Sequence, residues 1–275
     1  MRIRKRALPT GWYPGTEREV HRQIESWENL PALQGKAVSV VVPHAGWYYS
    51  GALAWRGIKA LSPEAETVVV VGGHLRENSG IIAAPEEGYE TPLGTLSADL
   101  ELREYLKEVV GIREDNYADN TVEIQLPLVK AAFPQAKALW IRVAPSRESE
   151  KLGEQLVVAA EALGRKIAVI GSTDLTHYGV NYGFFPKGRG REAVTWVKEV
   201  NDKRIISNLL SMNGKGALTI AALESSACSA GAAVCALEMA RHMGARAGIL
   251  IDYYTSYDID PADSFVGYAA ISYTV

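Results

Sequence analysis

The stretch V-S-V-V-V-P-H-A-G-W-Y-Y-S-G, residues 38–51, joins a valine-rich run to an abrupt stop at Pro43. The run is β-branched and too short for a helix of its own, so it predicts a buried strand. Proline has no N–H group for a sheet ladder, and we expect the strand to end there. His44 then follows the carboxyl end of the strand, which is where open α/β sheets bind their ligands.

The same pattern occurs twice more. Residues 67–71 form a second β-branched run that is followed by Gly-Gly and His74, and residues 167–170 form a third run, with His177 a few positions beyond it. A single histidine after a strand is more often an ordinary loop residue than a ligand. Here three of only five histidines lie just past predicted strand ends. If the strands are parallel neighbours, their imidazoles converge on one edge of the sheet.

Bulk composition indicates an ordinary globular chain. It has 275 residues, of which 47% are hydrophobic and 22% are charged, and a net charge of −3. Acids and bases are interspersed, which argues against a nucleic-acid surface, and no apolar run approaches the ~20 residues of a membrane span. The basic start of the chain precedes no apolar segment, so we expect no signal peptide. With two cysteines, a disulfide framework is not expected, and a cytoplasmic location is the default.

Strand and helix patterns alternate along the chain. The expected strands cover residues 38–42, 67–71, 81–85, 137–143, 166–171, 248–254 and 265–273. The expected helices cover residues 16–29, 50–61, 97–110, 123–133, 148–163 and 191–211, and a small-residue segment at 223–231 continues as a helix to 243. Residues 115–120, 181–190, 213–216 and 256–264 are expected as loops or breaks, and residues 89–96 as turn-rich. This order predicts a single α/β domain over residues 1–275, with a mostly parallel sheet and helices on both faces. The last two strands could pair antiparallel at an edge.

Two imidazoles with a third ligand suit a transition metal. Cys228 is one candidate for the third ligand, because it precedes a predicted helix whose N-terminus would lower its thiol pKa; the alternative is an ordinary buried cysteine. Asp174 and His177 are the other candidates. These two also suit a general acid/base pair, or partners that orient a ligand, although Asp174 could instead cap a helix. A Cys228 nucleophile with His177 as its base ranks lower, because no G-x-S-x-G motif is present.

Several motifs, taken in order, resemble the Memo family, whose bacterial and archaeal members are called AmmeMemoRadiSam system protein B. The resemblance covers essentially the whole chain. The matching motifs are GWYP at 11–14, PHAGWYYSG at 43–51, GGH at 72–74, YETPLG at 89–94, EIQLP at 123–127, STDLTHYG at 172–179 and GYAA at 267–270.

The resemblance implies a fold like that of the class III extradiol (LigB-like) dioxygenases, which use non-haem iron. It implies a metal site of two histidines and one cysteine, which fall here on His44, His74 and Cys228, with Asp174 and His177 lining the same cleft. Family members bind iron or copper, and the animal member also binds phosphotyrosine peptides. The resemblance further implies a functional link to AMMECR1-like and radical SAM proteins. No general enzymatic activity is established for the family.

The chain departs from the family pattern at one point. Many relatives have Glu-His-Ser before the glutamate of the E-x-Q-L-P motif, whereas residues 119–121 here are Asp-Asn-Thr. Asn120 therefore replaces a family histidine, which would weaken or alter any proton transfer that this histidine performs. The three proposed metal ligands are unaffected.

Two hypotheses follow. The first is a metalloprotein that binds iron or copper, with zinc as a further option, and has redox or dioxygenase-like chemistry in which Asp174 and His177 are catalytic. The second is a binding module for a peptide or small anion, in which metal is incidental. Both place a small molecule or peptide, rather than nucleic acid or membrane, in the cleft. The expected substrate contacts are Trp12, Tyr13, Trp47, Tyr49, Asn120 and Glu123.

Overall fold

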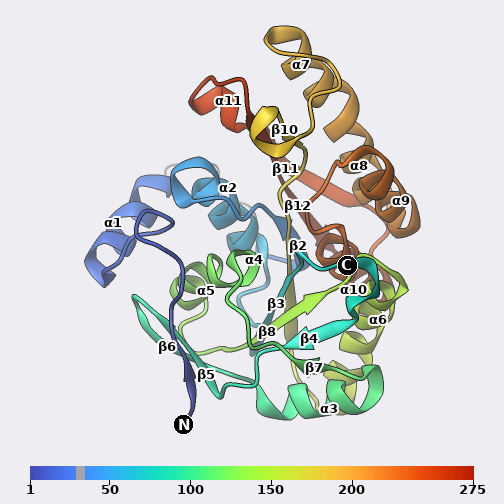
Figure 1. The fold of residues 1–275 in the computed structure, drawn as a ribbon. Coiled ribbons are helices and arrows are strands. Elements are labelled where there is room, and N and C mark those ends of the chain that lie inside the picture. The colour runs from blue at the N-terminus through green and yellow to red at the C-terminus, as the bar shows by residue number, and fades with distance from the viewer. Residues whose placement is uncertain (29–34) are drawn as a thin grey trace.

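A large sheet runs through the centre of the computed structural model, which describes residues 1–28 and 35–275 (Figure 1). Its strands are β2 (Ala37–Val42), β3 (Thr67–Gly72), β4 (Ile81–Ala83), β7 (Arg113–Glu114), β8 (Lys137–Val143), β9 (Ile167–Ser172), β10 (His177–Tyr178), β11 (Gly248–Thr255) and β12 (Phe265–Thr274). They lie in the order β10-β12-β2-β9-β3-β8-β4-β7, and β11 pairs with β12.

The centre of this sheet is parallel and its flanks are mixed. Strands β2, β9, β3 and β8 are parallel neighbours, and the first three of these are the β-branched runs of the sequence. On one side β12 pairs antiparallel with β2, and on the other β4 pairs antiparallel with β8. The predicted antiparallel pairing of the last two strands is confirmed. However, β12 lies inside the sheet, because it pairs with β2 as well as with β11.

Alternate valines of the central strands face opposite layers. Val69 and Val71 pack in one core with helices α3 (Leu100–Val110), α6 (Arg147–Ala162), α8 (Asp202–Leu210), α9 (Gly214–Glu224) and α10 (Ala230–Met243). Val68 and Val70 pack in a second core with α1 (Glu17–Trp27), α2 (Trp47–Ala60), α4 (Asn120–Glu123) and α5 (Leu126–Ala132). The predicted α/β class with helices on both faces is therefore confirmed. None of the helices described is both long and apolar enough to cross a membrane.

A small second sheet borders the second core. Residues 89–96, expected as turn-rich, form the hairpin of β5 (Gly88–Thr91) and β6 (Gly94–Ser97). The N-terminal strand β1 (Ile3–Arg4) pairs parallel with β5. The first residues of the chain are thus part of the fold, at the bottom of Figure 1.

Several helix boundaries differ from the predicted ones. The first helix begins after Thr16 with a capping box, as expected, but its predicted end at Asn29 lies outside the described residues. Helix α2 begins at Trp47 instead of Ser50, directly after the cap residue Gly46. The expected helix 97–110 begins only at Leu100, because the Asp99 side chain caps it.

Three further regions differ from the prediction in their helical structure. The expected helix 191–211 is divided into α7 (Arg191–Trp196), the π-helical turn η3 (Val197–Asn201) and α8. Residues 213–216, expected as a break, instead begin α9, which Asn213 caps. The expected loop 256–264 contains the short helix α11 (Ser256–Ile259).

Candidate metal centre

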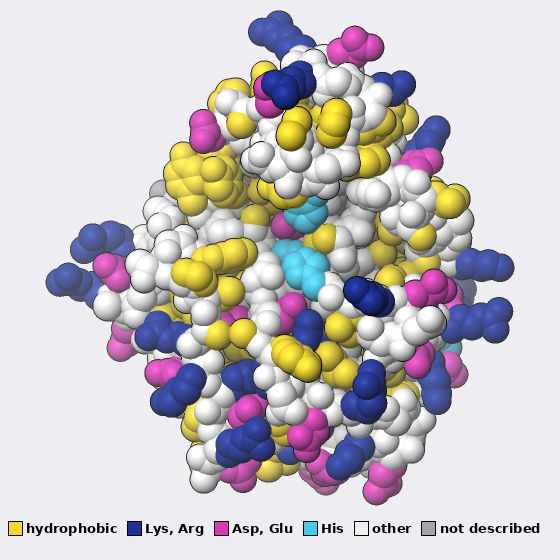
Figure 2. Space-filling view, in the orientation of Figure 1, with side chains coloured by type: hydrophobic (Ala, Val, Ile, Leu, Met, Phe, Trp, Pro, Cys, Tyr) yellow, Lys and Arg dark blue, Asp and Glu magenta, His cyan; other side chains and the backbone are white. Residues whose placement is uncertain are grey.

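The strand-end histidines meet where the central sheet ends. His44 follows β2 and His74 follows β3, and their ring centroids are 5.1 Å apart. Cys228 reaches the same place from the segment that joins α9 to α10. Figure 2 shows histidine side chains at the centre of one face of the molecule, within a hollow. The structure therefore brings together the three residues proposed as ligands, although they are far apart in the sequence.

The donor atoms are close enough to serve one ion. Cys228 Sγ lies 3.2 Å from His44 Nε2. One donor atom from each of the three residues lies within 4.8 Å of the other two. Two ligands bound to the same ion at about 2.0–2.3 Å stand roughly 3–3.6 Å apart. One pair already meets this spacing, and small side-chain rotations would bring in the third. Two imidazoles and a thiolate therefore fit a transition-metal ion.

Gly73 allows this close approach. A Cβ atom built on it would lie only 2.5 Å from the Cβ of Ser229, the neighbour of Cys228. The missing side chain therefore lets the loop of His74 pack directly against the loop of Cys228. His74 itself has a φ of +56°, in the left-handed region that non-glycine residues seldom adopt. Such backbone strain persists only where neighbouring contacts fix it.

Asp174 connects the loops of His44 and Cys228. Its Oδ1 accepts a hydrogen bond from the backbone N–H of His44 at 2.7 Å, and its backbone carbonyl accepts one from the N–H of Cys228 at 3.2 Å. The hydroxyl of Ser172 lies 3.3 Å from His44 Nδ1. Because Nδ1 faces this hydroxyl, Nε2 is the nitrogen that faces the sulfur of Cys228.

Asp174 and His177, proposed as an acid/base pair, lie close to each other and to His44. His177 Nε2 lies 3.7 Å from Asp174 Oδ2, and His44 Nε2 lies 3.8 Å from the same oxygen. Burial would raise the pKa of Asp174, but the facing His44 and His177 outweigh burial and hold it below its usual value. Burial would lower the pKa of His177, but Asp174 and the sulfur of Cys228 outweigh burial and raise it. A proton in this pair therefore stays on His177.

Asn120 and Glu123, both expected to contact substrate, have different surroundings. The amide of Asn120 donates to the carbonyl of His44 at 3.5 Å, so Asn120 borders the proposed site. The Glu123 carboxylate instead accepts hydrogen bonds from the backbone N–H groups of Ala7 and Leu8 and from the Tyr13 hydroxyl, at 2.9–3.0 Å. Burial and this carboxylate raise the pKa of Tyr13. Glu123 therefore anchors the N-terminal segment.

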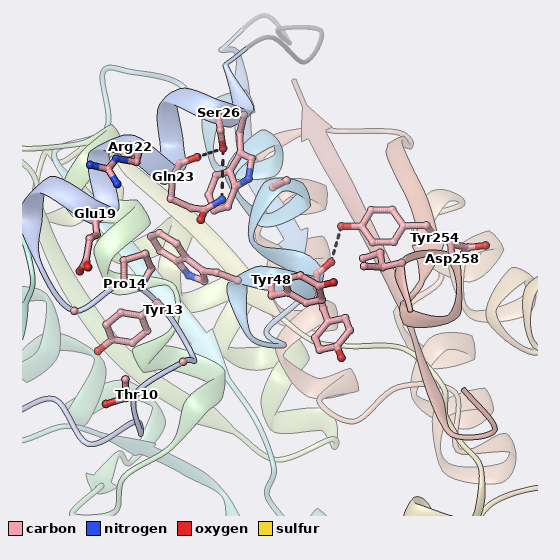
Figure 3. Close-up of a pocket in the computed structure, with 17 residues that line it drawn as sticks. Thr10, Tyr13, Pro14, Glu19, Arg22, Gln23, Ser26, Tyr48, Tyr254 and Asp258 are labelled. Atoms are coloured by element: carbon pink, nitrogen blue, oxygen red, sulfur yellow. Dashed lines mark hydrogen bonds between the residues drawn. The ribbon is translucent and has the colours of Figure 1, made fainter. Parts of the chain in front are cut away.

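Three of the four predicted aromatic residues line a neighbouring cavity of about 980 Å³ (Figure 3). Tyr13, Trp47 and Tyr49 line it, but none of the three proposed metal ligands does. Trp12 is not among the lining residues; its carbonyl accepts a hydrogen bond from the N–H of Trp47 at 2.8 Å. The early start of α2 explains the difference, because it places Trp47 in a helical turn that lies beside α1. Further aromatic lining comes from Trp27, Tyr48 and Tyr254.

Sequence reasoning missed a buried ion-pair network beside His74. It consists of Arg142 in β8 with Asp115 and Asp119 from the segment expected as a polar loop. One signal for it was present in the sequence: an arginine inside the apolar strand 137–143 is seldom buried without a charged partner.

Comparison with known proteins decides the family. Residues 4–272 match the family model described as Memo-like protein. The chain belongs to the Memo family. A MEMO1 family protein of Pyrococcus abyssi is 34% identical over 98% of both chains, and one of Archaeoglobus fulgidus is 29% identical over 96% of this chain and 97% of its own. The resemblance drawn from the motifs is therefore confirmed.

A solved structure shares the fold of this Memo-family chain. The uncharacterized protein JW3007 from Escherichia coli K12 superposes with a TM-score of 0.54 at 11% identity, covering 84% of this chain and 98% of its own. At this identity the likeness concerns the fold alone.

Proposed function

We propose that this Memo-family protein binds one transition-metal ion through His44, His74 and Cys228. The observation that supports the proposal is the convergence of their donor atoms to within 4.8 Å from three distant parts of the chain. Imidazole suits iron, copper and zinc, and thiolate favours softer ions such as copper(I) and zinc. Three protein ligands leave coordination positions open, which is the arrangement of catalytic rather than structural sites.

Within this proposal the protein is a redox or dioxygenase-like enzyme that uses iron or copper. A bound ion would supply Lewis-acid or redox chemistry. The chain itself would supply the Asp174–His177 pair, in which His177 carries the proton and the anionic Asp174 orients the ring. Asn120 cannot replace the family imidazole as a proton carrier, so proton transfer at this site depends on His177.

Metal analysis tests the proposal. Protein prepared without chelators is analysed for iron, copper and zinc by mass spectrometry. We expect a near-stoichiometric metal in the wild type and less than about a tenth of it in His44→Ala and Cys228→Ala, since each change removes one of only three ligands. Cys235→Ala is the matched control, because Cys235 is buried in the core of α10. Wild-type metal content in His44→Ala would rule out the proposed site.

The aromatic cavity favours a second function, the binding of a peptide or small anion without catalysis. Tyr48 on its wall is 72% exposed, and Arg22 provides a cation that can pair with a phosphate group. A phosphotyrosine peptide, followed by fluorescence anisotropy, is the probe. If this function holds, Tyr48→Ala and Arg22→Ala weaken binding, and His44→Ala does not. Loss of binding in His44→Ala alone would assign the peptide to the metal site instead.

A further inference from the structure

Arg142 is a buried cation with two buried carboxylate partners. Its Nε and one terminal nitrogen each donate to Asp115 at 2.8 Å, and its Nη1 donates to Asp119 Oδ2 at 3.0 Å. All three side chains are almost fully buried. The guanidinium of Arg142 is therefore shared by two carboxylates, and Arg4 reaches the same segment through the backbone carbonyl of Asp115.

The network contacts His74 and the residue before it. Asp119 Oδ2 lies 3.7 Å from His74 Nδ1, and Arg142 Nη1 lies 3.5 Å from the Gly73 carbonyl oxygen. Asp119 also accepts a hydrogen bond from the backbone N–H of Thr121 at 2.9 Å, and the Thr121 hydroxyl accepts one from the N–H of Gly73 at 3.1 Å. These contacts hold the loop in which His74 has its strained φ.

We infer that Asp119, held in place by Arg142, positions His74 as a metal ligand. A carboxylate on the Nδ1 side favours a proton at Nδ1 and leaves Nε2 free for the ion. The negative charge of Asp119, 3.7 Å from His74 Nδ1, also favours a cation at the site. This inference rests on the proposed metal-binding function and adds to it a residue that sets the affinity.

The two histidines differ in a way that supports this role. His44 is buried and has a neutral hydroxyl, that of Ser172, beside its Nδ1. His74 is exposed to solvent and has a charged carboxylate there. An exposed imidazole has more freedom to rotate, so it gains more from a fixed anionic partner.

Asp115 offers a matched control. It shares Arg142 with Asp119, but in the structure it makes no polar contact with His74 among the residues described. Asp119→Asn and Asp115→Asn therefore both remove one charge from the same network, and only the first removes the charge beside the ligand.

The experiment measures metal affinity and spectrum. Metal-free wild type, Asp119→Asn and Asp115→Asn are titrated with Co²⁺, and the d–d and thiolate charge-transfer bands are followed. We expect Asp119→Asn to weaken binding by about 10–100-fold and to shift the d–d bands. Asp115→Asn should bind Co²⁺ within about threefold of wild type. Restored affinity in Asp119→Glu, which keeps the charge, would support a positioning role.

Equal losses in the two Asn variants would overturn the inference, since they would indicate a purely structural network. Wild-type affinity in Asp119→Asn would also overturn it, while leaving the proposed function intact. No Co²⁺ binding by the wild type would remove both. If Asp119→Asn does not fold, ¹⁵N NMR of the metal-free wild type decides: the neutral His74 ring should be protonated at Nδ1, and an Nε2–H tautomer contradicts the inference.

Discussion

Asp202 is a fully buried carboxyl group directly after the π-helical turn η3. It accepts hydrogen bonds from the backbone N–H of Thr176 at 3.1 Å and from the Tyr253 hydroxyl at 2.8 Å. Burial nevertheless dominates and raises the pKa of Asp202 to about 6. Thr176 directly precedes His177, the proposed proton carrier. Asp202 therefore connects the backbone beside His177 to Tyr253 in β11.

We expect Asp202 to make stability depend on pH. An unfolded aspartic acid titrates near pH 4, so the folded protein binds this proton more tightly between about pH 4 and 6. The contribution of Asp202 to stability is therefore fully present below about pH 4 and is lost as the pH rises through 6, a change of roughly 2–3 kcal/mol. The Asp202→Asn variant should not lose this stability as the pH rises.

Urea unfolding of wild type and Asp202→Asn at several pH values between 4 and 7 provides the measurement. The stability of the variant relative to wild type should rise across this interval. A pH-independent difference would mean that Asp202 titrates normally. Other buried acids, such as Asp174 and Asp115, have lowered pKa values and act in the opposite direction, but they are common to both proteins.

At the scale of single residues, the sequence identified the groups whose chemistry is unusual for their position. His44 and His74 were found because each follows a β-branched run. Asp119 was missed because a charged residue in a polar segment resembles ordinary surface, and Arg142 was missed although it stands in an apolar strand. Their pairing depends on contacts between β8 and a distant loop, which no local pattern encodes.

At the scale of elements, a single side chain holds the N-terminal segment in place. The carboxylate of the buried Glu123 accepts hydrogen bonds from the backbone N–H groups of Ala7 and Leu8. Glu123→Ala would leave these donors without a protein partner, at a cost of roughly 1–3 kcal/mol. We therefore expect trypsin to cleave after Arg6 at least tenfold faster in the variant.

Timed proteolysis with mass spectrometry measures this cleavage. Glu90→Ala is the control, because among the described residues Glu90 forms an ion pair only with the exposed Lys5 near the same segment, at 3.6 Å, and such surface pairs contribute little. Equal cleavage rates in the two variants would show that Glu123 does not hold the segment.

At the scale of elements, the long amphipathic helices and the valine-rich strands were predictable, and the short elements were not. Helix α9 begins with G-K-G, which resembles a break because glycine is a poor helix former. Packing of Ala217 into the core and the Asn213 cap outweigh that tendency. The hairpin β5–β6 has strands of four residues each, too short for a clear alternating pattern.

If the proposed metal site is real, a bound ion should stabilise the whole molecule. A ligand at 100 times its Kd adds about 2.7 kcal/mol to the stability of the folded state. For a domain of this size, we expect a rise in Tm of roughly 5–10 °C. Differential scanning fluorimetry with Co²⁺ measures it, and His44→Ala should show no such rise. An equal rise in the variant would place the stabilising ion elsewhere.

At this largest scale the sequence predicted the parallel centre of the sheet but not its flanks. The repeated run of strand, loop and helix specifies β2, β3, β8 and β9 as parallel neighbours. The insertion of β12 beside β2 reflects pairing between the two ends of the chain. The residue pattern and composition of β12 do not reveal which strands it pairs with.

The internal position of β12 bears on how the protein is made in the cell. A ribosome delivers residues 265–274 long after β2, so the nascent chain exposes the side of β2 that β12 covers until those residues emerge. Unpaired strand edges of this kind invite aggregation, which makes the growing chain a candidate for chaperone binding. Cys228 also lies far along the chain from His44 and His74, so the three proposed ligands can come together only after the segment of Cys228 has been synthesised. An ion that binds at the proposed site would therefore bind after that segment has emerged.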